Sequence, residues 1–215
     1  SISYIHLVNY GKQRKVQTQS VRLAELSAVR MGVTLRGRDA TRPVEGGSCR
    51  LVRISDVSQD GTWLNADFAH IEPAERIRDD HFLRSGDVLF PNRGTRTTAI
   101  AFRMEQPRII AGAQFFVLRP NVARVVPEYL AWFLRSESAA RHFEERRKGT
   151  YVQIVERRDL EDLDLPLPPL EMQRKIVEAA ALAIEERSLS EKIAVLRARL
   201  VAGELLAAAR QGHTD

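Results

Sequence analysis

Two glycine-containing stretches of the sequence carry side chains that are suited to contacting a nucleic acid. One follows the apolar run Val88–Phe90 and surrounds Gly94, and the other surrounds Gly149. Glycine lets the backbone approach a phosphate closely, while neighbouring polar side chains reach sugars and base edges. The candidate nucleic-acid contacts in these stretches are Asn92, Arg93, Thr95, Arg96, Lys148, Thr150 and Tyr151.

Four further residues extend this candidate interface. Gln114 is suited to an adenine edge, as Arg96 is to a guanine edge, because each side chain presents two groups for hydrogen bonding. Arg36, Arg38 and Arg42 share a stretch rich in Gly, Thr and Arg, which is typical of a loop. We interpret this stretch as a basic loop that lies near DNA.

Structural roles compete with several of these assignments. Arg96 and Arg103 are equally compatible with solvated strand positions, and Tyr151 is equally compatible with a core position. Asp87 is better explained as part of a turn than as a DNA contact. Asp56 lacks the Glu-x-Lys partner that nuclease chemistry needs on a following strand, so we expect it to cap a turn.

Motifs for catalysis are missing from the sequence. It contains no G-x-x-x-x-G-K-[ST] phosphate loop, no H-E-x-x-H, and no G-x-G-x-x-G after a predicted strand. Neither a Gly-rich S-adenosylmethionine loop nor an Asn-Pro-Pro-aromatic tetrapeptide is present. The histidines are too scattered to predict a metal site; they are His6, His70, His81, His142 and His213. We therefore expect a non-catalytic chain that uses no cofactor and no metal.

The basic excess of the chain lies in its first three-quarters, and the last segment is mildly acidic. Residues 1–53 hold 10 Lys and Arg against 3 Asp and Glu, whereas residues 161–215 hold 7 against 10. A polyanionic partner is consistent with this distribution, although genomic base composition also raises arginine content.

The single cysteine, Cys49, is expected to be a small residue beside a strand. With no apolar run long enough to span a bilayer and no secretory signal, a cytoplasmic protein without membrane contact is expected.

The order of apolar and polar residues predicts a mixed α+β domain whose sheet is mostly antiparallel. Predicted helices cover residues 21–32, with Ser20 as the cap and Gly32 as the end, and residues 127–147. Residues 74–86 are expected to form a short helix or a turn. Predicted strands lie within residues 49–58, 87–95, 98–104 and 108–120. The expected organisation is a basic tether over residues 1–18, a domain over 19–168 and a helix over 169–211.

The last segment differs from the rest because it contains no proline after Pro169 and is rich in Ala, Glu, Leu and Arg. A helix of about 40 residues would be roughly 60 Å long, with possible bends at residues 187–190 and at Gly203. An apolar stripe at heptad-like spacing runs along it and requires a partner helix. The stripe consists of Leu182, Leu189, Ile193, Leu196 and Leu200.

Several phrases, taken in order from about residue 22 to residue 187, resemble the specificity subunits of type I restriction-modification enzymes. They are RLAELSAVRMGVTLRGR, LVRISDVSQDG, GDVLFPNRGT, IIAGAQFFVLRP, PEYLAWFLRS and KGTYVQIVERRDLEDLDLPLPPLEMQRKIVE. The order and spacing of these phrases carry the resemblance, since no single phrase is decisive.

The resemblance implies a target-recognition domain that reads one half of a bipartite double-stranded DNA site. It also implies that the following helix acts as a spacer and docks DNA methyltransferase subunits. Family members usually hold two such units in tandem, and this sequence holds one. Two copies are therefore expected to pair their helices around a two-fold axis and to read an inverted repeat with a fixed gap. A fragment of a longer chain is the competing explanation.

A second class of function stays open beside DNA recognition. The chain would then be an interaction or scaffold protein whose helix forms a coiled coil, with an incidental basic surface. The two hypotheses differ in the salt dependence and the sequence preference of binding to duplex DNA.

Overall fold

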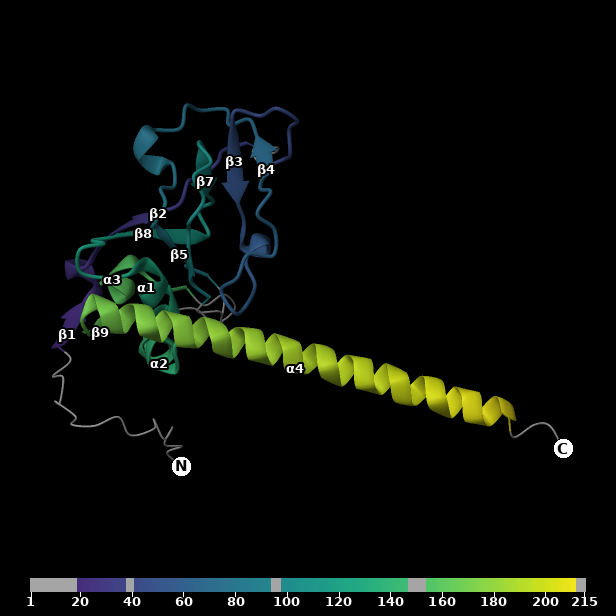
Figure 1. Ribbon diagram of the computed structural model, residues 1–215. Coiled ribbons are helices and arrows are strands. Elements are labelled where there is room, and N and C mark those ends of the chain that lie inside the picture. Colours follow the sequence, from purple (N-terminus) through teal and green to yellow (C-terminus); the bar gives the residue numbers. More distant parts are fainter. Residues whose placement is uncertain (1–18, 38–40, 94–97, 147–153, 212–215) are drawn as a thin grey trace.

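A computed structural model describes residues 19–37, 41–93, 98–146 and 154–211. It has the predicted mixed α+β architecture: an α+β body, by which we mean all elements before α4, followed by one long helix (Figure 1). The strands are β1 (Gln19–Arg22), β2 (Ser27–Met31), β3 (Cys49–Val52), β4 (Ala69–Ile71), β5 (Val88–Pro91), β6 (Ile100–Ala101), β7 (Ile109–Ala111), β8 (Phe115–Pro120) and β9 (Asp164–Leu167). The α-helices are α1 (Pro127–Leu134), α2 (Glu137–Glu144), α3 (Arg157–Glu161) and α4 (Leu170–Gln211). Short 3₁₀ turns are η1 (Leu23–Glu25), η2 (Ile54–Asp56) and η3 (Asp79–His81).

The central sheet has the antiparallel order β2-β8-β5-β6 and is buried on both faces. Val88 and Phe90 of β5 pack into a core together with α1, whereas Leu89 between them packs into a second core. In β8, Phe116 and Phe115 divide between the same two cores. Alternation of side chains across the strand explains why the sequence here is continuously apolar instead of alternating with polar residues.

A smaller sheet with the order β4-β3-β7 lies at the end of the body away from α4 (Figure 1). Strand β3 pairs in antiparallel fashion with β4 and in parallel with β7, so the fold is mixed as expected. Cys49 of β3 is 2% exposed, and burial raises the pKa of its thiol. The expectation of a small residue inside a strand is confirmed, and Cys49 needs no other role.

The helix predicted over residues 21–32 is wrong. This segment instead forms β1, η1 and β2, with β1 pairing with β9 and β2 pairing with β8. Buried Leu23, Leu26 and Val29 recur at helix-like spacing, but they reach the core from a strand–turn–strand path. Pairing with strands that lie far along the sequence outweighs the local pattern.

Two other element predictions also need correction. The single helix predicted over residues 127–147 is divided into α1 and α2, because Ser136 leaves the helix and its Oγ accepts a hydrogen bond from the Ala139 N–H. Such a side-chain contact is typical of a helix N-terminus. The strand predicted within residues 108–120 is also divided, into β7 and β8, around the turn at Gly112.

Helix α4 runs without interruption from Leu170 to Gln211 and extends far beyond the body (Figure 1). At about 1.5 Å per residue its 42 residues span roughly 63 Å. Its first turns pack against α1, with Ile176 and Val177 joining the larger core. The bends considered at residues 187–190 and at Gly203 are not present. All five residues of the predicted stripe are exposed, from 48% for Ile193 to 63% for Leu200.

The start of α4 is held to the body by the side chain of Gln173, which is 0% exposed. Its Oε1 accepts a hydrogen bond from the Val126 N–H at 2.8 Å. Its Nε2 donates to the carbonyl oxygens of Pro168 at 2.8 Å and Arg124 at 3.1 Å. A buried amide with these partners joins the turn before α1, the proline-rich exit and the first turn of α4.

Tyr129 of α1 makes a second connection to the same exit. Its hydroxyl donates to the Pro166 carbonyl at 2.7 Å, and burial raises the pKa of Tyr129 to about 12. The phenol therefore stays neutral and keeps this hydrogen bond throughout the physiological pH range.

A close approach of two backbone segments predicts the effect of substituting Gly32. A Cβ at this position would lie 2.1 Å from the Gly112 carbonyl oxygen and 2.7 Å from that of Ala111. Gly32→Ala should therefore destabilise the chain by about 1–3 kcal/mol in urea unfolding. Gly203→Ala is the matched control: it meets no atom within 4 Å, and it should stabilise α4 by about 0.5–1 kcal/mol. Equal stability of Gly32→Ala and the wild type would contradict the close approach.

The contacts of Gln173 predict a second effect on stability. Gln173→Leu removes the amide and leaves the Val126 N–H and two carbonyls without their partner, which should cost about 1–3 kcal/mol. Amide hydrogen exchange should accelerate in the first turns of α4. Arg174→Leu places the same side chain at the exposed neighbouring position and should change neither measurement. Unchanged exchange in Gln173→Leu would show that the helix is held by other contacts.

Candidate nucleic-acid interface

The segment Val33–Leu35, which follows β2, separates two cavities on the body. Val33 itself forms a parallel bridge with Gly112. The first cavity, which we call the Gln114 cavity, has a volume of about 490 Å³. Besides Gln114 and apolar side chains it is lined by the polar residues Thr34, Thr41, Arg53 and Ser55.

Gln114 lies in the turn between β7 and β8, with its side chain exposed at the cavity. The next residue, Phe115, is 1% exposed and packs inside the body. Across the cavity, the Arg53 guanidinium donates to the Thr41 carbonyl and so connects η2 with the loop that carries Arg42. Gln114 therefore has an accessible amide on a backbone that the core holds in place.

Asn92 does not lie at the surface, although the sequence indicates a DNA contact there. It is 2% exposed, and its Nδ2 donates to the Ala113 carbonyl at 2.8 Å. Its N–H donates to the Gln114 carbonyl at 2.9 Å, and its own carbonyl accepts from the Val155 N–H at 3.0 Å. Asn92 thus supports the backbone of the Gln114 turn, and we do not retain it as a contact residue.

The other predicted contact residues divide into two groups. Arg93 is exposed beside the Asn92 position and forms a bridge with Ile154, while Arg36 and Arg42 are exposed on the loop after β2. The remaining predicted contacts lie outside the described residues: Arg38, Thr95, Arg96, Lys148, Thr150 and Tyr151. Among the described residues, the structure therefore brings Arg93 and Gln114 to neighbouring backbone positions.

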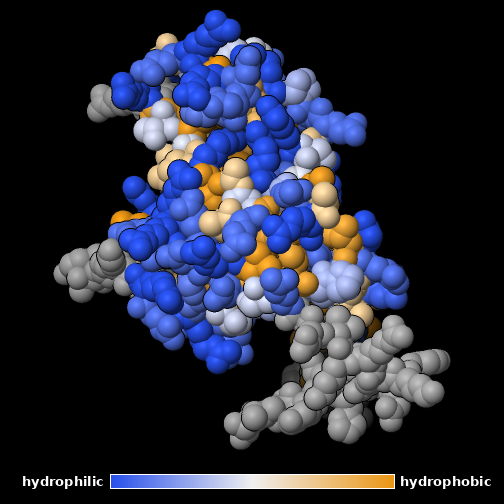
Figure 2. Space-filling view, turned by 90° about the vertical axis from the view of Figure 1, so that its left-hand side faces the viewer, coloured by the Kyte–Doolittle hydropathy of each residue, from blue (hydrophilic) through white to orange (hydrophobic). Residues whose placement is uncertain are grey.

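The second cavity, which we call the arginine cavity, lies on the other side of Val33–Leu35 and has a volume of about 470 Å³. Arg36 is the one predicted contact residue that lines it. The sequence gives no signal for the other three arginines, because Arg30 lies far along the chain from Arg76 and Arg78. Its charged and titratable lining consists of Arg30, Arg36, Glu75, Arg76, Arg78 and His81. Figure 2 shows a molecular face that is mainly hydrophilic, with a limited hydrophobic area near its centre.

Asp56 and Asp87 have the structural roles that the sequence indicates. The Asp56 carboxylate accepts from the Arg53 N–H at 2.8 Å, and the Asp87 carboxylate accepts from the Arg84 N–H at 2.9 Å. Asp87 is 1% exposed and also pairs with the Arg119 guanidinium through bonds of 2.8 and 2.7 Å. Hydrogen bonding to Asp87 raises the pKa of Arg119. These two carboxylates therefore close turns and neutralise a cation.

Arg103, for which a solvated strand position is one expectation, pairs with Glu128 at the start of α1.

Within residues 19–37, 41–93, 98–146 and 154–211, no three His, Cys, Asp or Glu side chains are grouped so that they could hold a metal ion. In the same part of the chain, no helix is both long enough and apolar enough to cross a membrane.

Comparison with known proteins connects this architecture to one family. No protein-family model matches the sequence. A type I restriction enzyme MjaX specificity subunit of Methanocaldococcus jannaschii is 30% identical over an alignment of 101 residues, and the match covers 42% of this chain and 22% of the relative. The chain therefore spans less than a quarter of that relative.

Solved structures give a broader match at lower identity. A chain from a study of complex assembly and conformational transition in a type I R-M system has a TM-score of 0.61 at 22% identity, and covers 87% of this chain and 44% of its own length. The HsdS subunit from Thermoanaerobacter tengcongensis has a TM-score of 0.56 at 20% identity, with coverages of 83% and 40%. The type I restriction-modification S subunit from M. genitalium has a TM-score of 0.53 at 12% identity, with coverages of 82% and 41%.

Because their sequence identities are 22% or less, the solved structures establish the fold alone. The chain spans less than half of the length of each of them. The sequence match to the Methanocaldococcus relative is independent of that likeness in fold. The resemblance to type I restriction-modification specificity subunits, which the order of the sequence phrases indicates, is therefore confirmed in sequence by one relative and in fold by three solved chains.

Proposed function

We propose that this chain is a non-catalytic DNA-specificity subunit that reads one half of a bipartite target and acts as a homodimer. The observation that carries the proposal is the connection of a body with two cavities, each lined in part by polar side chains, to a 42-residue helix whose apolar stripe is exposed. A single chain thus offers one reading surface and one surface for self-association.

The reading surface in this proposal surrounds the Gln114 cavity. An exposed amide on a supported turn is suited to an adenine edge, and the arginines around it are suited to guanine edges and phosphates. The basic excess in residues 1–53 supports this assignment. The proposed contacts are Arg36, Arg38, Arg42, Arg93, Thr95, Arg96, Gln114, Lys148, Thr150 and Tyr151.

Self-association in this proposal uses the distal part of α4. An exposed leucine–isoleucine stripe at heptad-like spacing is stabilised when a second helix covers it. Antiparallel pairing of two α4 helices would carry one body at each end and produce two identical reading surfaces related by a two-fold axis. The target would then be an inverted repeat with a fixed gap.

Recruitment of a DNA methyltransferase subunit is the third part of the proposal. It rests on the resemblance to specificity subunits, whose complexes modify DNA, and on the absence of catalytic motifs in the sequence. We assign the docking of that subunit to the surface of paired α4 helices.

Selection from random duplexes tests the reading function. The purified full-length chain, together with its methyltransferase partner, should enrich an inverted repeat with a gap of constant length. If about 6–10 phosphates are contacted, affinity should fall by about 10³–10⁵ between 50 and 200 mM salt. Binding that is indifferent to sequence would exclude a specificity subunit and favour the coiled-coil scaffold.

Substitutions in α4 test the dimer. The pair Ile193→Glu and Leu196→Glu places two charges on the stripe and should convert a dimer into a monomer by light scattering. The matched control, Ala198→Glu with Ala202→Glu, adds the same charge on the opposite side of the helix and should leave the dimer intact. A wild-type chain that is monomeric at high concentration would contradict self-association.

A further inference from the structure

The arginine cavity has a composition that the role of the Gln114 cavity does not explain. It is bounded by residues 30–36, which run from the end of β2 into the following segment, and by residues 73–78 together with His81. Four arginines and one glutamate are the residues with full charges among its lining. Most of these side chains point from exposed loops, whereas Arg30 comes from a strand of the central sheet.

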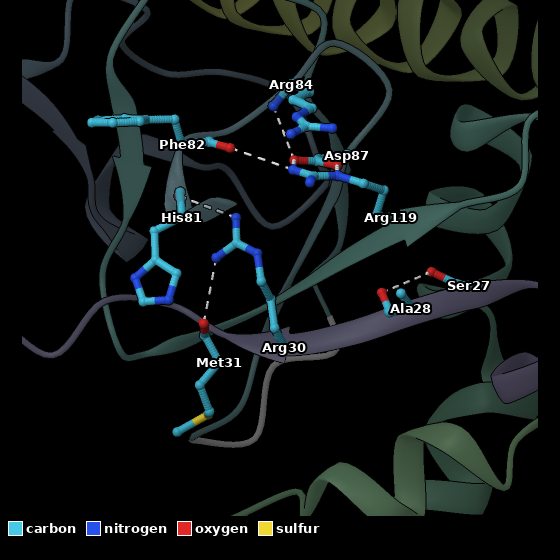
Figure 3. Close-up of polar contacts among 9 residues, drawn as sticks. All are labelled: Ser27, Ala28, Arg30, Met31, His81, Phe82, Arg84, Asp87 and Arg119. Carbon is cyan, nitrogen blue, oxygen red and sulfur yellow. Dashed lines mark hydrogen bonds and ion pairs between the residues drawn. The ribbon is translucent and has the colours of Figure 1, made fainter. Parts of the chain in front are cut away.

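Arg30 is partly buried, whereas the other three arginines of this group are exposed. Its guanidinium donates to the His81 carbonyl at 3.1 Å and lies 3.5 Å from the Met31 carbonyl (Figure 3). Among the described residues, no carboxylate lies within 4.0 Å of it. A partly buried guanidinium that is bonded to carbonyls alone keeps its full positive charge near the cavity.

Two neighbouring acids, Asp87 and Asp80, act on Arg30 through their charge, but each of them pairs with another arginine. Figure 3 shows Asp87 and Met31 on opposite sides of the Arg30 guanidinium. The Asp87 carboxylate accepts hydrogen bonds from the Arg84 N–H and the Arg119 guanidinium. Burial lowers the pKa of Arg30; the charge of Asp87 opposes this, and Arg119 lowers the pKa further. The cost of keeping this cation charged would decrease if an anion entered the cavity.

The remaining arginines are available to the same anion. Arg36 lies 3.5 Å from Glu75, and both side chains are more than two-thirds exposed. Arg78 pairs with Asp80 at the surface, and Arg76 has no ion-pair partner within the described chain. Exposed ion pairs contribute little to stability, so these side chains exchange partners easily.

We propose that the arginine cavity holds a backbone phosphate of duplex DNA, with Arg30 and Arg76 as its main ligands. This rests on the proposed function, since the Gln114 cavity adjoins the arginine cavity across Val33–Leu35. A phosphate held on one side of that segment positions the duplex while Gln114 reaches a base on the other side. The arginine cavity therefore contributes affinity and register without reading sequence.

Salt titrations of full-length variants test this assignment on two duplexes, one selected by the chain and one unrelated. Each lost phosphate contact lowers the slope of log affinity against log salt by about 0.9. Arg30→Gln with Arg76→Gln removes both ligands of one phosphate and should therefore lower the slope by about 0.9 on both duplexes, while the ratio of the two affinities stays constant. The affinity loss between 50 and 200 mM salt should become about three- to fourfold smaller than in the wild type.

The matched control is Arg157→Gln with Arg158→Gln on α3, which removes the same charge from exposed arginines that do not line the cavity. It should leave the slope near that of the wild type. Arg30→Lys keeps the charge and should retain most of the slope. Arg76→Gln alone changes an exposed side chain, so it tests the site without altering the packed interior.

An unchanged slope in Arg76→Gln and in the double variant, with wild-type binding intact, overturns the phosphate site and leaves the reading function standing. An equal loss in the α3 control also overturns it, because general charge would then explain the effect. Absence of duplex binding by the wild type contradicts the proposed function itself, so the two failures are distinguishable.

Discussion

The three hydrogen bonds of the buried Gln173 amide fix how the long helix leaves the body. They join the segment before α1, the proline-rich exit and the first turn of α4 at one point. Because α4 extends roughly 60 Å from this point, a small change of angle at its start becomes a large displacement at its end. The position of any second body attached to the helix therefore depends on this short polar contact, and Tyr129 supports it from α1.

Parts of this fold follow from local sequence, and parts do not. The strand at Val88–Phe90 and the helix after Pro169 are predicted correctly, since a buried apolar run and a long proline-free heptad pattern are local signals. The segment Val21–Gly32 is predicted wrongly because its apolar spacing fits a helix, while the partners that make it β-structure, β8 and β9, lie about 90 and 145 residues away. The division at Ser136 depends on one hydroxyl group as a helix cap.

The candidate interface shows the same limit. Sequence identifies Gln114 by its chemistry, and the structure places it at a cavity. The Asn92 side chain is equally suited to hydrogen bonding with DNA, but it is buried, and only the tertiary packing reveals this. Arg30 and Arg76 are overlooked because the sheet and a distant loop bring them together, and no short motif contains both. Residue type thus indicates what a side chain can bind, whereas tertiary packing decides whether it is accessible.

The alternation of Gln114 and Phe115 has an evolutionary consequence. The Gln114 side chain is exposed at the cavity, whereas Phe115, which also lines it, is 1% exposed and packs in the core. Substitutions at exposed cavity positions such as Gln114 change the chemistry offered to a ligand without altering the packed interior. A lineage can therefore diversify what this surface recognises through single mutations, each of which leaves a foldable protein.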